Sequence, residues 1–112
     1  MNRHGARHDP RSWKLLRRLH PLALERFCDR VLAEIERITH GSSESAHERY
    51  LEILKTITQR DREMASTFDN PRRSIALTML AGMRSDGLLM EDEFSGLSSE
   101  TRNAINLILG TE

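Results

Sequence analysis

The chain has 112 residues, of which 38% are hydrophobic and 30% charged, with a formal net charge of zero and one cysteine. This length allows one domain with its own core, and a lone cysteine excludes an internal disulfide and favours a reducing compartment. No apolar run approaches the roughly 18 residues of a membrane span. No apolar segment of the kind found in secretory signals follows the basic N-terminus. We therefore expect a cytoplasmic protein with no transmembrane segment.

Positive charge is concentrated at the start of the chain. Residues 1–20 contain one acidic side chain, Asp9, and a larger set of basic ones: Arg3, Arg7, Arg11, Lys14, Arg17 and Arg18. Such a basic arm can contact the phosphates of nucleic acid or an acidic partner, or it can lie along the acidic surface of its own domain or of a second copy. The sequence thus predicts an N-terminal arm over residues 1–20 and a single helical domain over residues 21–112.

Within the arm, residues 1–10 have almost no apolar side chains and are expected to be disordered or loosely docked. Residues 11–19 favour a short helix whose Trp13 packs on the domain. His20 and Pro21 should interrupt it, because the residue before a proline is disfavoured in the helical conformation. Pro21 then suits the first turn of the next helix.

Two long helices are predicted over residues 22–39 and 45–68, each with apolar side chains at steps of three and four. Ser45 and Glu48 have the spacing of a capping box at the start of the second helix. The apolar series are Leu24, Cys28, Val31, Ile35 and Ile38 in the first helix and Tyr50, Leu54, Ile57, Met64 and Phe68 in the second. Because the linker between the helices is short, they should form an antiparallel hairpin.

The remaining residues predict shorter helices. Asn70 and Pro71 have the character of an N-cap and first position for a third helix, which should end where Gly87 can take a left-handed conformation. Residues 90–94 favour a helical turn, and Ser98 should cap a last helix over residues 99–109. No segment alternates as a strand does. The predicted fold is all-α, a small bundle of four to five helices built on a central antiparallel helical hairpin.

Asp61 is a polar residue within the apolar series of the second long helix. The two helices share a heptad pattern, so their hairpin could pair with a second copy through a seam of Tyr50, Leu54, Ile57, Asp61 and Met64. In such a seam a buried Asp61 would need a basic partner. Alternatively, Asp61 lies at a solvated rim, or it serves as a catalytic carboxylate beside neighbouring arginines.

Other candidate sites are weaker. Arginines around residues 60–62 and 72–73 could bind a phosphate near the turn after the second long helix, but alternating charges are also typical of a solvated helix face. The five histidines have no recognisable metal-ligand spacing, and Cys28 lies on an apolar face that favours an inert thiol. We expect no metal, no cofactor and no catalytic residue.

These patterns predict a non-enzymatic helical module for protein–protein interaction or regulation, self-associating and with a homodimer favoured. The alternative is a nucleic-acid-associated protein that contacts phosphates through the basic arm. An enzyme that uses Asp61 is a third hypothesis.

Overall fold

The computed structural model describes residues 10–41 and 44–110, and every regular element in that part of the chain is helical. The all-α prediction is therefore confirmed. The elements are α2 (Pro10–Thr39), α3 (Ala46–Phe68), the 3-10 turn η1 (Arg73–Ile75), α4 (Ala76–Ser85), α5 (Glu91–Ser95) and α6 (Ser99–Leu109). Arg3 and Arg7 of the predicted basic arm lie outside the described residues.

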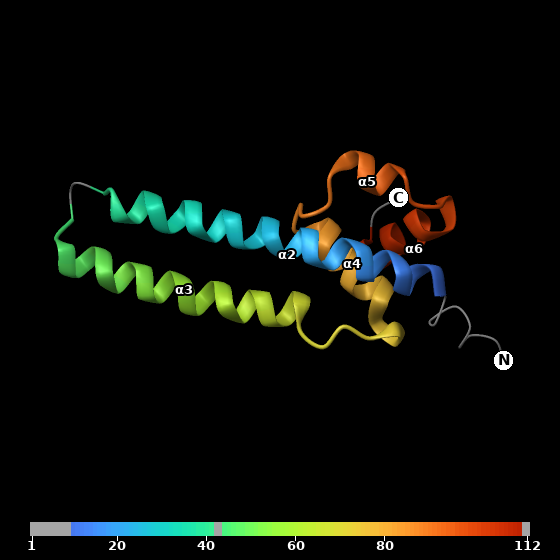
Figure 1. Ribbon diagram of the computed structural model, residues 1–112, viewed down its shortest axis with the longest axis horizontal. Helices are drawn as coiled ribbons and strands as arrows, with labels where there is room; N and C mark the ends of the chain where they lie inside the picture. The colour runs from blue at the N-terminus through green and yellow to red at the C-terminus, as the bar shows by residue number, and fades with distance from the viewer. Residues whose placement is uncertain (1–9, 42–43, 111–112) are drawn as a thin grey trace.

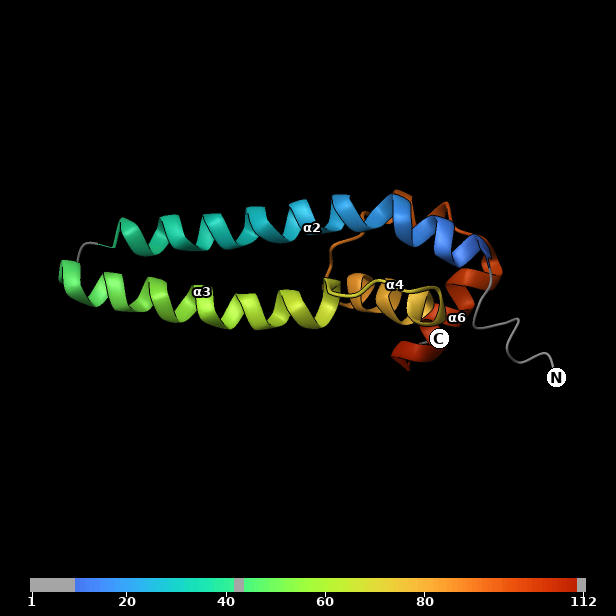
Figure 2. The same cartoon turned by 60° about the horizontal axis from the view of Figure 1, so that its bottom comes forward.

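The predicted break at His20 and Pro21 is wrong, because α2 runs through it as one helix of 30 residues with Pro21 inside. A proline inside a helix removes one backbone hydrogen bond and favours a bend. In Figure 2 the blue N-terminal part of α2 slopes away from the line of the rest of the helix. Leu19 and Ala23, on either side of the proline, are both in the core, so packing holds the helix together across it. The predicted boundary between arm and domain thus falls within α2.

α3 begins with the predicted capping box. The Ser45 hydroxyl accepts a hydrogen bond from the Glu48 amide, and the Glu48 carboxylate accepts one from the Ser45 amide. α2 and α3 run side by side in opposite directions and project from the remaining helices (Figures 1 and 2). The molecule is correspondingly elongated, with extents of 60 × 26 × 24 Å.

The turn after α3 differs from the prediction. Asn70 does not cap a helix but takes a left-handed conformation with φ 54°, which asparagine tolerates better than most residues. Helical structure resumes only at η1, so α4 begins at Ala76. Gly87 has φ 69° and turns the chain after α4, as predicted.

The core lies at one end of the molecule, where the first half of α2 meets α4 and α6. Its fully buried side chains include Leu16, Leu80, Met83, Leu88 and Ile105. Trp13 is partly buried against this cluster, as expected for a segment that packs on the domain. In the hairpin beyond this end, from Leu24 to Met64, only Thr56 reaches the buried class among the described residues. The hairpin beyond this end therefore contributes little to the buried core.

An ion pair fastens α2 to α5. Arg26 donates two hydrogen bonds to the carboxylate of Glu93, at 2.7 and 2.8 Å, and a third to the carbonyl of Leu88 at 2.9 Å. The hydrogen bonds from Arg26, helped by one from the Met90 amide and opposed by partial burial, lower the pKa of Glu93 from 4.5 to about 2. This bidentate pair fixes the loop after α4 against the middle of α2.

Candidate interaction surface

The face of α3 that meets α2 is not its most apolar one. Arg49, Ile53, Thr56 and Arg60 recur at steps of four and three, and all four are buried or half-buried. Arg60 donates to Glu34 of α2 at 3.0 Å, and Arg49 donates to the Thr39 carbonyl at 2.7 Å. These contacts set the rotation of α3 about its own axis, with a partly polar stripe turned toward α2.

The predicted seam is consequently turned to the side of the hairpin. The exposed fractions are 63% for Tyr50, 53% for Leu54 and 45% for Ile57. Leu54 is six residues before Arg60, which places it about 120° around the helix at roughly 100° per residue. Met64 differs from these three because it packs against the core.

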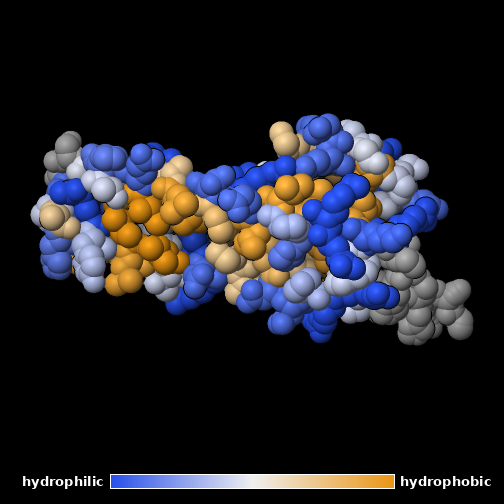
Figure 3. Space-filling view, viewed as in Figure 1, coloured by the Kyte–Doolittle hydropathy of each residue, from blue (hydrophilic) through white to orange (hydrophobic). Residues whose placement is uncertain are grey.

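α2 adds apolar side chains on the same side of the hairpin. Leu32 is 63% exposed, and Cys28 and Ile35, one turn before and after it, are half-buried. Figure 3 shows apolar side chains gathered over both helices toward the loop end of the hairpin. We call this surface the hairpin apolar face and define it by Leu32, Tyr50, Leu54 and Ile57.

Asp61 lies at the end of the hairpin apolar face nearer the core. It is exposed and follows Leu54 by two turns and Ile57 by one, so it shares their side of α3. In the single chain Asp61 is therefore in contact with water, which agrees with the solvated rim that was one alternative from the sequence. It would become buried only if another surface covered the face.

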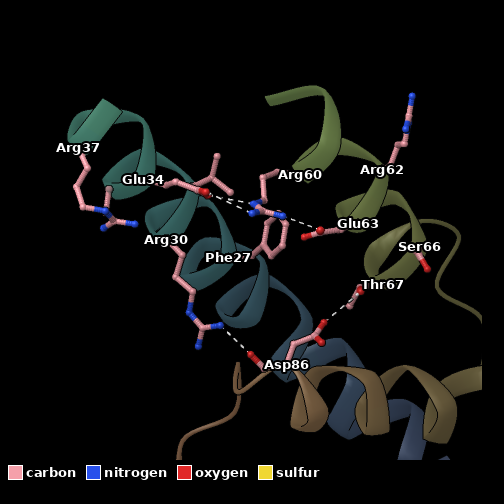
Figure 4. Close-up of a pocket in the computed structure, with 12 residues that line it drawn as sticks. Phe27, Arg30, Glu34, Arg37, Arg60, Arg62, Glu63, Ser66, Thr67 and Asp86 are labelled. Carbon is pink, nitrogen blue, oxygen red and sulfur yellow. Dashed lines mark hydrogen bonds and ion pairs between the residues drawn. The ribbon is translucent and has the colours of Figure 1, made fainter. Parts of the chain in front are cut away.

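The opposite side of the hairpin is a charged groove of about 850 Å³ (Figure 4). There Arg60 bonds both Glu34 and Glu63, the latter at 2.6 Å, while Arg30 donates to the carbonyls of Asp86 and Gly87. Hydrogen bonding to Arg60 lowers the pKa of Glu34, and the same contact raises the pKa of Arg60. Arg60 is therefore engaged by two carboxylates of the groove itself.

The arginines that the sequence grouped near one turn are separated. Arg60 is beside Glu34 of α2, whereas the Arg73 guanidinium lies 5.7 Å from the centre of the Trp13 ring. Residues 13 and 34 of one helix are about 30 Å apart at a rise of 1.5 Å per residue. The predicted phosphate pocket from both arginine groups is therefore not formed.

A basic surface instead forms around the start of α2. Lys14, Arg17 and Arg18 are exposed there, and the chain before α4 brings Arg73 over the Trp13 ring, with the exposed Arg72 next to it in the sequence. Arg11 pairs with Glu100 of α6 at 3.1 Å. The sequence identified the basic residues of α2. It gave no sign that residues 72 and 73 belong to the same surface, because that depends on the packing of η1 on α2.

The other candidate groups have local structural roles. The His20 ring nitrogen Nε2 is 2.9 Å from the Phe68 carbonyl, and the two rings meet edge to face. Cys28 is half-buried. No group of three His, Cys, Asp or Glu side chains suited to a metal ion occurs between residues 10 and 41 or 44 and 110; His4 and His8 lie outside those ranges.

Among the described helices, none has the length and apolar content needed to cross a membrane. Comparisons of the chain with protein-family models, with curated proteins and with solved structures find no match.

Proposed function

We propose that this protein is a non-enzymatic helical interaction module that self-associates through the hairpin apolar face. The observation that carries the proposal is the exposure of four large apolar side chains on one side of two adjacent helices. A contiguous apolar patch rimmed by charge is typical of a protein-binding surface. A second copy is the occupant that we favour, because pairing two such faces completes a four-helix arrangement.

The energetics favour a reversible dimer. Two copies bring together eight side chains that are each about half exposed, and covering them would contribute about 6–12 kcal/mol, at about 1.5–3 kcal/mol for each side chain that is fully covered. This gain is similar to the roughly 4–15 kcal/mol that association costs. Self-association should therefore depend on protein concentration.

The test is absolute mass by light scattering over a hundredfold range of concentration, at low and high salt. We expect a dimer that dissociates on dilution. Leu54→Glu should give a monomer of unchanged helicity, because Leu54 is exposed in the single chain. Leu107→Glu is the matched control: Leu107 is 79% exposed on α6, and its variant should dimerise normally. A wild-type monomer at all concentrations, or equal dimerisation of both variants, would contradict the proposal.

Asp61 supplies a second measurement on the same face. If a second copy covers the face, the Asp61 carboxylate is removed from water. This desolvation costs free energy that an apolar side chain would not lose. Asp61→Leu should then strengthen the dimer by at least about tenfold. An unchanged dissociation constant would place Asp61 outside the contact.

The basic surface supports a second candidate function, which is binding to the phosphates of nucleic acid. Two separate segments contribute exposed cations to it, and Trp13, Arg17 and Pro71 border a hollow of about 270 Å³ beside it. Deleting residues 1–20 is not a useful test, since Leu16 and Leu19 belong to the core.

Charge reversal at Lys14 and Arg17 avoids that problem. Wild-type affinity for single- and double-stranded oligonucleotides should fall steeply with salt, and Lys14→Glu with Arg17→Glu should weaken binding and reduce the salt slope by about one for each lost phosphate contact. Leu54→Glu is the control with an intact basic surface. Affinity that is flat with salt would exclude this function.

A further inference from the structure

A hollow at the start of α2 is shared by the two segments that form the basic surface. Its volume is about 270 Å³, and the residues that line it are Trp13, Leu16, Arg17, His20, Pro21 and Pro71. The first five have the i, i+3, i+4, i+7, i+8 spacing of one side of a helix. Pro71 comes from the chain between α3 and η1. The hollow is therefore built from two parts of the chain that only the fold brings together.

The walls of the hollow are rich in rings. Trp13, Pro21 and Pro71 all border it, and Trp13 is only half-buried because it packs partly against the core. The His20 ring is held in place by its contact with the Phe68 carbonyl, which lies 2.9 Å from Nε2. Ring walls of this kind favour a flat ligand that can stack. The volume is just below the roughly 300–1,000 Å³ of pockets for drug-sized ligands, so the hollow suits a single ring system.

Cations stand on both segments that line the hollow. Arg17 is part of the lining on α2 and is exposed, and the lining contains no acid. On the other segment the exposed Arg72 follows Pro71 directly, and the Arg73 guanidinium lies 5.7 Å from the centre of the Trp13 ring. None of these three arginines forms an ion pair in the part of the chain that the structure describes. Phosphate groups that flank a bound ring would therefore meet unpaired guanidinium groups.

A nucleobase joined to phosphates has both of the properties that this site selects. In a duplex the faces of each base are covered by its neighbours, whereas an unpaired base of a single strand can stack on an aromatic side chain. We propose that the hollow takes one unpaired base of a single-stranded nucleic acid, with the flanking phosphates at Arg17, Arg72 and Arg73. This inference rests on nucleic-acid binding, the second candidate function above, and adds the form of nucleic acid and the residues that contact the base.

The first experiment compares strands that have the same phosphates with and without bases. The probes are an oligothymidylate, which forms no secondary structure of its own, and an abasic strand of the same length. The oligothymidylate should bind about tenfold or more tightly than the abasic strand, because a stacked base adds to the phosphate contacts.

Fluorescence locates the bound base. Trp13 is the only tryptophan of the chain, so its emission reports on the hollow. Saturating oligothymidylate should quench this emission. The abasic strand, and the oligothymidylate paired with its complement, should leave it nearly unchanged at saturation, because neither has an unpaired base to insert.

A substitution at Trp13 tests the stacking directly. Trp13→Leu keeps an apolar contact with the core but removes the aromatic ring, and it should bind the oligothymidylate and the abasic strand with nearly equal affinity. Leu54→Glu lies outside the basic surface and should keep the wild-type ratio of the two affinities. Circular dichroism checks that the helices of both variants are intact; if Trp13→Leu does not fold, the comparison of strands on the wild-type protein decides the question.

The outcomes separate the base site from nucleic-acid binding itself. Failure of every strand to bind at low salt refutes both. Equal wild-type affinity for the two strands, equal quenching by the duplex, or a Trp13→Leu variant that keeps the wild-type ratio refutes the base site and leaves binding through phosphates in place. Thymidine 5′-monophosphate should bind far more weakly than the oligothymidylate; equal affinity would refute the strand as the occupant and make a free nucleotide the ligand.

Discussion

A substitution at Glu93 tests how much its ion pair with Arg26 contributes to holding α5 against α2. Glu93→Gln keeps the size of the side chain and its capacity to accept from the Met90 amide, which lies 2.8 Å from Glu93 Oε1. It removes the charge that Arg26 faces. The change thus isolates the ion pair that joins α2 to α5.

The expected loss follows from the pKa of Glu93. Lowering it from 4.5 to about 2 corresponds to at most about 3 kcal/mol, at 1.36 kcal/mol per tenfold change in the proton equilibrium. The two side chains remain 29% and 19% exposed, so screening by water reduces the figure to about 2 kcal/mol. Glu93→Gln should lower the free energy of unfolding by about that amount at pH 7.

The pH dependence gives the sharper result. The pKa of Glu93 is lower in the folded state, so its contribution is complete above the unfolded pKa near 4.5 and is lost as the pH falls toward about 2. Urea unfolding followed by circular dichroism, at equal protein concentrations, should show the difference between wild type and variant shrinking over that interval. A difference that is undiminished at pH 2.5, or one below about 0.5 kcal/mol at pH 7, would contradict this role of the ion pair.

Glu91→Gln is the matched control on the same short helix. Glu91 accepts a hydrogen bond from Arg84 at 2.8 Å, but its side chain is 81% exposed. Exposed ion pairs contribute little. The variant should unfold within about 0.5 kcal/mol of the wild type.

Three further substitutions test the fold by the same urea measurement. Leu80→Ala, at a fully buried position, should cost about 2–5 kcal/mol, and a loss below about 1 kcal/mol would contradict the placement of the core. Ser45→Ala removes the N-cap of α3 and should cost about 1 kcal/mol together with some helical signal, whereas no change in either would argue against the capping box. Pro21→Ala restores a backbone donor inside α2 and should stabilise the protein by about 1 kcal/mol or more; destabilisation would mean that the core requires the bend.

Local sequence signals determined where most helices begin and end. Ser45 and Ser98 accept hydrogen bonds from amides three residues onward, and Gly110 ends α6 in a left-handed conformation with φ 77°. Each of these interactions joins residues close in the chain, so the residue types and their spacing suffice to predict it. The prediction failed at Pro21 because distant packing in the core outweighed a local preference.

Tertiary structure decided which surfaces are covered. Apolar periodicity shows that a helix has an apolar side, but not which element will pack on it. In α3 the contacts of Arg49 and Arg60 with α2 turn Leu54 and its neighbours to the outside. The pairing of Arg26 with Glu93, and the approach of Arg73 to Trp13, join residues about sixty apart in the chain and leave no local signal. The candidate interaction surfaces arise from these long-range contacts, because they depend on how the helices are rotated and placed against one another.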